Sequence, residues 1–165
     1  MSSSIGEFQA GSLYLDTMVL YLFLRVRDSE AEPLLRKIQT GEIHAFTSVL
    51  TFDELAYRLL LALIRDTYGS SPLDKLRQDE QSMIAQFYPD IAPKLLRLQE
   101  FPNLTLIDVT PADLLAMHEN MGRFRLRPRD ALHLAAMQKV NCPYLVSQDA
   151  DLDRVPTITR YTLGG

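Results

Sequence analysis

The chain has very little cysteine. Cys142 is the only one among 165 residues, so no internal disulfide bond can form. The N-terminal stretch, MSSSIGEFQAGS, is polar and unlike a signal peptide. No apolar run approaches the roughly 20 residues that a membrane-spanning helix requires. From these absences we expect a soluble protein of the reducing cytoplasm that makes no contact with a membrane.

Several motifs of phosphate-binding proteins and hydrolases are also missing. The sequence contains no GxxxxGKS, GxxxxGKT, GxGxxG, GxSxG or HExxH pattern. The run DADLDR begins like a calcium loop, but Arg154 stands where the turn glycine belongs and Arg160 where the closing glutamate belongs. The three histidines, His44, His118 and His133, are scattered. A lone histidine on a helix, such as His133, is more often a packed core residue than a ligand.

The formal net charge of -4 argues against a protein that coats nucleic acid through its overall charge. Positive charge is concentrated in one place, GRFRLRPRD, where arginines occupy every second position before Asp130: Arg123, Arg125, Arg127 and Arg129. Two interpretations stay equally open. The arginines could grip a phosphate chain, such as a nucleic-acid backbone, beside an acidic site, or they could pair with surface acids in a solvated loop.

What the chain does have is a regular alternation of apolar segments. With 47% hydrophobic residues it can bury one core, so we expect a single domain over residues 1–165. Strands are predicted at residues 12–15, 43–47, 104–109 and 144–147, with a final edge strand at 157–162. Helices are predicted from residue 17 onward, at 29–39, at 49–65, after a Thr110 cap, at 128–140, and as a hairpin over 73–100 divided between Pro89 and Pro93. Such alternation indicates a parallel sheet with helices on both faces, which binds ligands beyond the carboxyl ends of its strands.

Four acids sit at the ends of mostly apolar elements or inside them: Asp16, Glu54, Asp130 and Asp149. Burying a carboxylate costs several kcal/mol unless a cation or hydrogen bonds replace the water. Asp16 and Asp149 follow predicted strands, whereas Glu54 and Asp130 lie in the opening turns of helices that begin at the same edge. All four are therefore expected to converge on one cleft, where their oxygen ligands suit Mg²⁺ or Mn²⁺ better than zinc.

Each acid also has an ordinary structural interpretation. Asp16 could cap the helix that follows it, and Asp130 could interact favourably with a helix dipole. Asp149 could be a turn residue, which is the strongest of these alternatives because further aspartates follow it. Glu54 could pair with Arg58, four residues later on the same helix.

Taken in order, the segments LYLDTMVL, SVLTFDEL, RPRDALHLAAM and LVSQDADL resemble the PIN domain, and within that family the VapC-type toxin ribonucleases of bacterial and archaeal toxin–antitoxin pairs. The resemblance extends from about Leu13 to Val155. It implies a PIN-like α/β/α fold of three layers around a mainly parallel sheet. Residues of about 1–11 would form an N-terminal extension, and residues of about 73–100 a helical insertion longer than in a minimal VapC toxin.

The resemblance also implies roles for particular residues. The metal-binding and catalytic acids would be Asp16, Glu54, Asp130 and Asp149, with Asp151 as a further metal ligand and Thr17 and Ser147 as supporting hydroxyls. The implied activity is a metal-dependent endoribonuclease that uses one or two Mg²⁺ or Mn²⁺ ions. Its partners would be RNA, a cognate VapB-like antitoxin and a second copy of the chain. Met18 departs from the small residue usual after the Asp-Thr pair.

Two alternatives remain open within this resemblance. The chain could be a PIN-fold nuclease of another branch, which acts in RNA processing or on structured DNA. It could also be a binding module with a vestigial metal site, although four retained acids argue against that.

Overall fold

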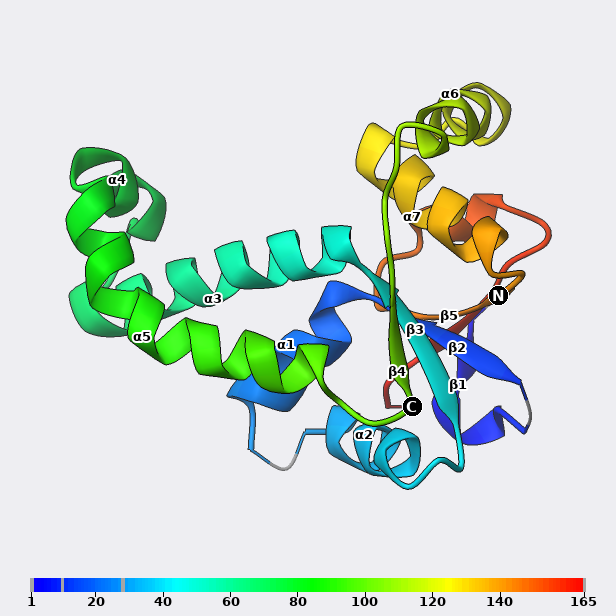
Figure 1. Cartoon of the computed structure of the whole chain (residues 1–165), viewed down its shortest axis with the longest axis horizontal. Coiled ribbons are helices and arrows are strands. Elements are labelled where there is room, and N and C mark those ends of the chain that lie inside the picture. The colour runs from blue at the N-terminus through cyan, green and yellow to red at the C-terminus, as the bar shows by residue number, and fades with distance from the viewer. Residues whose placement is uncertain (1, 10, 28, 165) are drawn as a thin grey trace.

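A computed structural model describes residues 2–9, 11–27 and 29–164, and these form one parallel sheet with helices on both faces (Figure 1). The sheet has six strands in the order β1-β6-β5-β2-β3-β4, and every pairing between them is parallel. The strands are β1 Ser3–Ser4, β2 Ser12–Leu15, β3 His44–Ser48, β4 Leu104–Ile107, β5 Tyr144–Val146 and β6 Thr159–Thr162. The predicted α/β class is confirmed.

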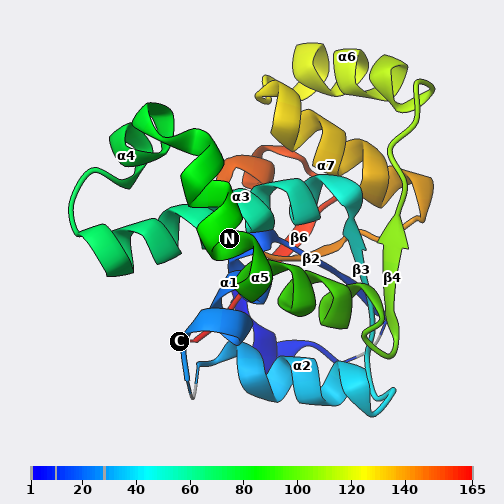
Figure 2. The ribbon, with the colours of Figure 1, turned by 60° about the vertical axis from the view of Figure 1, so that its left-hand side comes forward.

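Seven α-helices lie within the described ranges: α1 Thr17–Arg25, α2 Ala31–Gln39, α3 Val49–Tyr68, α4 Pro72–Gln78, α5 Glu80–Gln99, α6 Asp113–Phe124 and α7 Pro128–Lys139. Two short 3₁₀ helices, η1 Ile5–Glu7 and η2 Asp151–Arg154, complete the elements. Helices α6 and α7 cover one face of the sheet, while α1, α2, α3 and α5 lie on the other side (Figures 1 and 2). No helix in the described ranges is long and apolar enough to cross a membrane.

Two apolar cores follow from the alternation of side chains along the strands. In β2, Leu13 and Leu15 pack into the core beneath α1, α2, α3 and α5, whereas Tyr14 between them faces the core beneath α7. In β5, Val146 packs into the first of these cores and Leu145 packs into the second. Because successive strand residues point to opposite faces, a strand buried on both sides carries an unbroken apolar run, as LYL does here.

Helices α3, α4 and α5 form an arm that extends beyond the sheet on one side (Figure 1). The sequence predicted two helices here, but the break lies at Asp79 rather than between Pro89 and Pro93. Both prolines stand inside α5, on its exposed face, where water can satisfy the carbonyl oxygens that lose their partners. The opposite face of α5 buries apolar side chains such as Phe87 and Ile91, and this packing keeps the helix continuous.

Three smaller predictions need correction. Strand β6 is not the edge of the sheet, because β1 of the N-terminal segment pairs with it. Helix α3 continues to Tyr68, beyond the predicted end. Helix α6 begins at Asp113, after the predicted cap, although the Thr110 amide donates to the Asp113 carboxylate at 2.7 Å. That bond is the returning half of a capping box.

Candidate functional site

The carboxyl ends of the central strands open into a cavity of about 680 Å³. Five acids predicted from the sequence line it: Asp16, Glu54, Asp130, Asp149 and Asp151. They come from the end of β2, the start of α3, the start of α7 and the segment after β5. The strand order explains their meeting, because β2 and β5 are neighbours and α3 follows β3 on the other side of β2.

Asp16 is held by two hydrogen bonds. As the N-cap of α1, it accepts the Thr17 amide through Oδ1 at 2.7 Å, so the capping interpretation is confirmed. Its Oδ2 accepts the hydroxyl of Ser147 at 2.6 Å. Ser147 is buried at the end of β5, and its Oγ also accepts the Asp149 amide at 3.0 Å. One side chain therefore caps a helix and presents a carboxylate to the cavity.

Glu54 is fixed through both of its oxygens. Oε2 accepts the Thr17 hydroxyl at 2.6 Å, and Oε1 lies 3.1 Å from His133 Nε2. Burial raises the pKa of Glu54, but the hydrogen bonds from His133 and Thr17 and the nearby charge of Arg129 bring it below its ordinary value. Arg58 points its Nη1 to Met18 Sδ, 3.3 Å away. The interpretation of a Glu54–Arg58 helix pair is therefore wrong.

The other three acids surround one guanidinium group. Arg127 Nε lies 3.1 Å from Asp130 Oδ2, while its Nη2 lies 3.6 Å from Asp149 and contacts Asp151. Burial raises the pKa of Asp130, although Arg127 acts in the opposite direction. Asp149 also accepts the Asp151 amide at 3.0 Å, which is the turn geometry that the sequence suggested.

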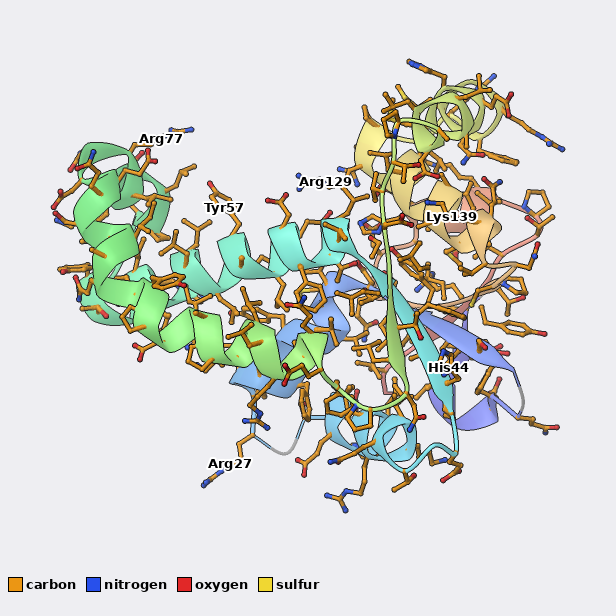
Figure 3. All side chains as sticks on the ribbon, in the orientation of Figure 1. Arg27, His44, Tyr57, Arg77, Arg129 and Lys139 are labelled. Carbon is orange, nitrogen blue, oxygen red and sulfur yellow. The ribbon has the colours of Figure 1, made fainter. Side chains whose placement is uncertain are left out.

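The four arginines do not form one loop. Arg123 ends up in α6, Arg125 follows that helix with a φ of 54°, Arg127 is the N-cap of α7, and Arg129 lies in its first turn. Only Arg127 and Arg129 line the cavity. Both pair with acids of the fold, since Arg129 contacts Asp53 at 3.1 Å. Figure 3 shows Arg129 between the start of α3 and α7.

The donor chemistry of the site suits a hard divalent cation, because the five acids offer carboxylate oxygens and no sulfur ligand is among them. Within the ranges that the structure describes, no three acidic, histidine or cysteine side chains lie close enough together to hold a metal ion as they stand. In this structure, arginine side chains rather than a cation supply the positive charge beside the acids. Binding a cation therefore requires small side-chain movements, above all of Arg127.

Two residues of the site were missed in the sequence. His133 was interpreted as a packed core residue, and Tyr14 was placed in a strand without a role. Both line the cavity, and the Tyr14 hydroxyl lies 2.7 Å from His133 Nδ1. Burial raises the pKa of Tyr14, so its hydroxyl stays protonated. The spacing of these residues could have placed them in the site. His133 lies one helical turn after Asp130, and Tyr14 lies two residues before Asp16 on the same strand face.

An ion pair between the buried Arg160 and the exposed Asp153 supports the segment that carries Asp149 and Asp151. Arg160 of β6 is 7% exposed and donates to both carboxylate oxygens of Asp153 at 2.7 and 2.8 Å. Its Nη1 also donates to the Ser147 carbonyl at 3.1 Å. Hydrogen bonding by Arg160 holds the pKa of Asp153 below its usual range. The pair ties η2 to the end of β5 and so fixes the path of the chain along one wall of the cavity.

Comparisons with known proteins agree with the fold described above. The family model of the PIN domain matches residues 13–158. Among solved structures, the fold is similar to VapBC2 of Rickettsia felis bound to a DNA fragment from its promoter, with a TM-score of 0.56, 16% identity, and 93% of this chain and 100% of that chain covered. It is also similar to VapBC-1 of nontypeable Haemophilus influenzae, with a TM-score of 0.55, 14% identity and coverages of 93% and 98%.

A third similar structure is Mycobacterium tuberculosis VapC20, described as a toxin that cleaves the sarcin–ricin loop. The TM-score is 0.53 at 14% identity, with 88% of this chain and 95% of that chain covered. Comparison with the sequences of curated proteins gives no match. At these identities the structures establish the fold alone, while the family model covers most of the chain. The chain belongs to the PIN domain family.

Proposed function

We propose that the protein is a divalent-metal-dependent endoribonuclease and the toxin of a VapBC-type toxin–antitoxin pair. The observation that carries this proposal is the convergence of five acids from four separate segments on one cavity at the carboxyl edge of a parallel sheet. Family membership and the fold shared with VapC proteins support the same function. The arginines at the cavity wall supply the positive charge that a phosphate backbone needs.

In this proposal, Mg²⁺ or Mn²⁺ would be held by oxygens of Asp16, Glu54, Asp130 and Asp149, with Asp151 as a further ligand. Such an ion supplies a water that ionises near neutral pH and stabilises the leaving oxygen of the phosphodiester. Thr17 and Ser147 keep the first two carboxylates oriented through the hydrogen bonds described above.

The direct experiment is incubation of the purified protein with a mixed RNA pool and Mn²⁺, followed by sequencing of the new ends. Single-stranded and hairpin DNA pools of the same lengths and an EDTA arm run in parallel. Cleavage of RNA alone, abolished by EDTA, supports the proposal. Cleavage of structured DNA would favour another branch of the family, and cleavage that persists in EDTA would exclude the metal-dependent mechanism. The exposed variant Asp74→Asn, on α4 and away from the cavity, serves as the control.

The arginines of the cavity give one prediction. Each phosphate contact contributes about 0.7 to the slope of log binding constant against log salt for a single strand. Changing Arg129→Ala should therefore flatten the slope for RNA by about 0.7, because Arg129 lines the cavity. Arg123→Ala is the matched control, since Arg123 lies over the Phe124 ring on α6, and it should change the slope by less.

Filter binding at several salt concentrations measures both slopes. Equal flattening in the two variants would restore the original hypothesis that all four arginines grip the RNA. No change in either variant would assign the arginines to pairing with acids of the fold.

Partners form a further part of the proposal. A VapB-like antitoxin is expected because the similar structures include VapBC complexes. We also propose a homodimer that forms through the arm of helices α3, α4 and α5. Helix α1 packs against α2 and α3 within the fold, whereas the arm keeps exposed apolar side chains. A groove between α3 and α5 is lined by exposed side chains such as Tyr57, Ile84, Tyr88 and Leu96.

We expect light scattering at micromolar concentration to give the mass of a dimer. Tyr88→Glu should shift the protein toward the monomer, because a buried charge in an interface costs several kcal/mol. Leu115→Glu is the control, since Leu115 is equally exposed but lies on α6, at the other end of the molecule. A monomeric parent protein would contradict the prediction.

A further inference from the structure

A chain of hydrogen bonds runs along the wall of the acidic cavity. The Tyr14 hydroxyl lies 2.7 Å from His133 Nδ1, and His133 Nε2 lies 3.1 Å from Glu54 Oε1. Tyr14 is 1% exposed and His133 is 7% exposed. The two rings meet edge to face with centroids 5.8 Å apart. Neither residue belongs to the set of acids and hydroxyls that the family resemblance suggested.

With a neutral imidazole, the chemistry of the three groups fixes the direction of these bonds. An ionised carboxylate only accepts hydrogen bonds, so the contact with Glu54 requires a proton on His133 Nε2. A neutral imidazole then has a bare Nδ1, which accepts the proton of the Tyr14 hydroxyl. Tyr14 thus selects the ring form and the ring orientation that let His133 donate to Glu54. The same logic orients imidazoles beside metal sites in other proteins.

These bonds connect three elements that each carry a proposed metal ligand. Tyr14 lies in β2, which ends beside Asp16, while His133 lies in α7 one turn after Asp130. Glu54 belongs to α3. The packed ring of His133 therefore restricts rotation of the Glu54 carboxylate at Oε1, where Arg129 Nε also lies 3.4 Å away. Thr17 holds the other oxygen, at 2.6 Å.

We propose that His133, held in place by Tyr14, is a positioning residue that orients the Glu54 carboxylate for binding of the divalent cation. This inference rests on the proposed function, since it takes Glu54 as a ligand of that ion. The competing view is that His133 only fills space in the core beneath α7. The two views differ in what happens when the ring is replaced by an apolar side chain that keeps the packing.

The test is direct binding of Mn²⁺ to the purified protein, measured by calorimetry. His133→Leu fills the space of the ring but cannot donate, so it should weaken Mn²⁺ binding by roughly 10- to 100-fold. His133→Gln carries an amide near the position of Nε2 and should recover most of the affinity. Tyr14→Phe removes a single hydroxyl, so the fold tolerates it most readily. It should weaken binding by roughly 2- to 10-fold.

Two controls separate positioning from packing. Met137→Leu changes a fully buried side chain of the same helix with little change in volume, and it should leave Mn²⁺ affinity unaltered. The double variant His133→Leu with Tyr14→Phe should bind Mn²⁺ as the single His133→Leu does, because Tyr14 acts through the ring. Melting temperatures of all variants, taken without metal, report the packing loss separately.

The outcomes distinguish this inference from the proposed function. Unchanged Mn²⁺ affinity in both His133→Leu and Tyr14→Phe, with the parent protein binding normally, would overturn the positioning role and leave the nuclease proposal intact. A failure of His133→Gln to bind better than His133→Leu would also overturn it. Absence of Mn²⁺ binding in the parent protein would overturn both. If His133→Leu fails to fold, the affinity of Tyr14→Phe decides.

Discussion

Asp16→Asn should lower the rate of RNA cleavage by at least about 100-fold while the fold survives. Changes to residues that only support metal ligands typically cost 10- to 100-fold in affinity or activity, so loss of a charged ligand should cost more. Asparagine is itself a favoured N-cap, and its oxygen can still accept the Thr17 amide. Its amide group can donate to the Ser147 hydroxyl, which now donates to Asp16. The local structure therefore retains its hydrogen bonds and loses only the negative charge.

Cleavage of a labelled RNA in Mn²⁺ measures this effect, and circular dichroism checks the fold. Melting adds a second readout, because a cation that binds only the folded protein stabilises it by about 2.7 kcal/mol at a hundredfold excess over its Kd. The parent protein should gain this stability and Asp16→Asn should gain little of it. Parent-like cleavage by the variant would show that the acids act through shape rather than charge, contrary to the proposed mechanism.

Asp153→Asn should destabilise the protein by about 1 to 2 kcal/mol, because the buried guanidinium of Arg160 loses its countercharge while solvent reaches the exposed position 153. For a chain of this length, this corresponds to a fall in Tm of roughly 2 to 8 °C. Cleavage should decrease as well, since the pair holds the segment that carries Asp149 and Asp151. Glu32→Gln is the control, because its i,i+4 partner Arg36 is exposed and such pairs contribute at most a few tenths of a kcal/mol.

The same pair predicts a pH dependence. Arg160 depresses the pKa of Asp153, so the folded protein holds a carboxylate that protonates more readily when unfolded. The resulting stability is fully present above the unfolded pKa of about 3.9 and is lost as the pH falls through the lower folded value. The difference in Tm between the parent protein and Asp153→Asn should therefore shrink below about pH 4. A Tm difference that stays constant as the pH falls well below 4 would contradict the ion-pair explanation.

Much of the site could be predicted because its acids lie at the ends of apolar segments. In a parallel sheet the carboxyl ends of all strands meet at one edge, so Asp16 and Asp149 could be placed at that edge once the strands were recognised. The pairing of β2 with β5 then makes them neighbours. Glu54 and Asp130 followed from the helices that begin at that edge. These inferences used only the alternation of strands and helices, which local sequence patterns carry well.

What the sequence did not reveal depends on contacts between distant segments. The partners of Glu54 are Thr17, Arg129 and His133, which lie far from it in the sequence, rather than Arg58 on the same helix. Pro89 and Pro93 do not interrupt α5, because packing against α3 outweighs their local cost. The even spacing of the arginines suggested one loop, but a helix end intervenes and turns two of them away from the cavity.

A crystal structure of the protein grown with Mn²⁺, with anomalous scattering recorded, is the measurement closest to the proposed chemistry. We expect an anomalous peak inside the cavity, about 2.1 Å from carboxylate oxygens of at least two acids among Asp16, Glu54, Asp130 and Asp149. The Arg127 guanidinium should then have moved away from Asp130. A well-ordered cavity without such a peak, in which Arg127 still contacts Asp130 and Asp151, would contradict the assignment of a metal-dependent nuclease site.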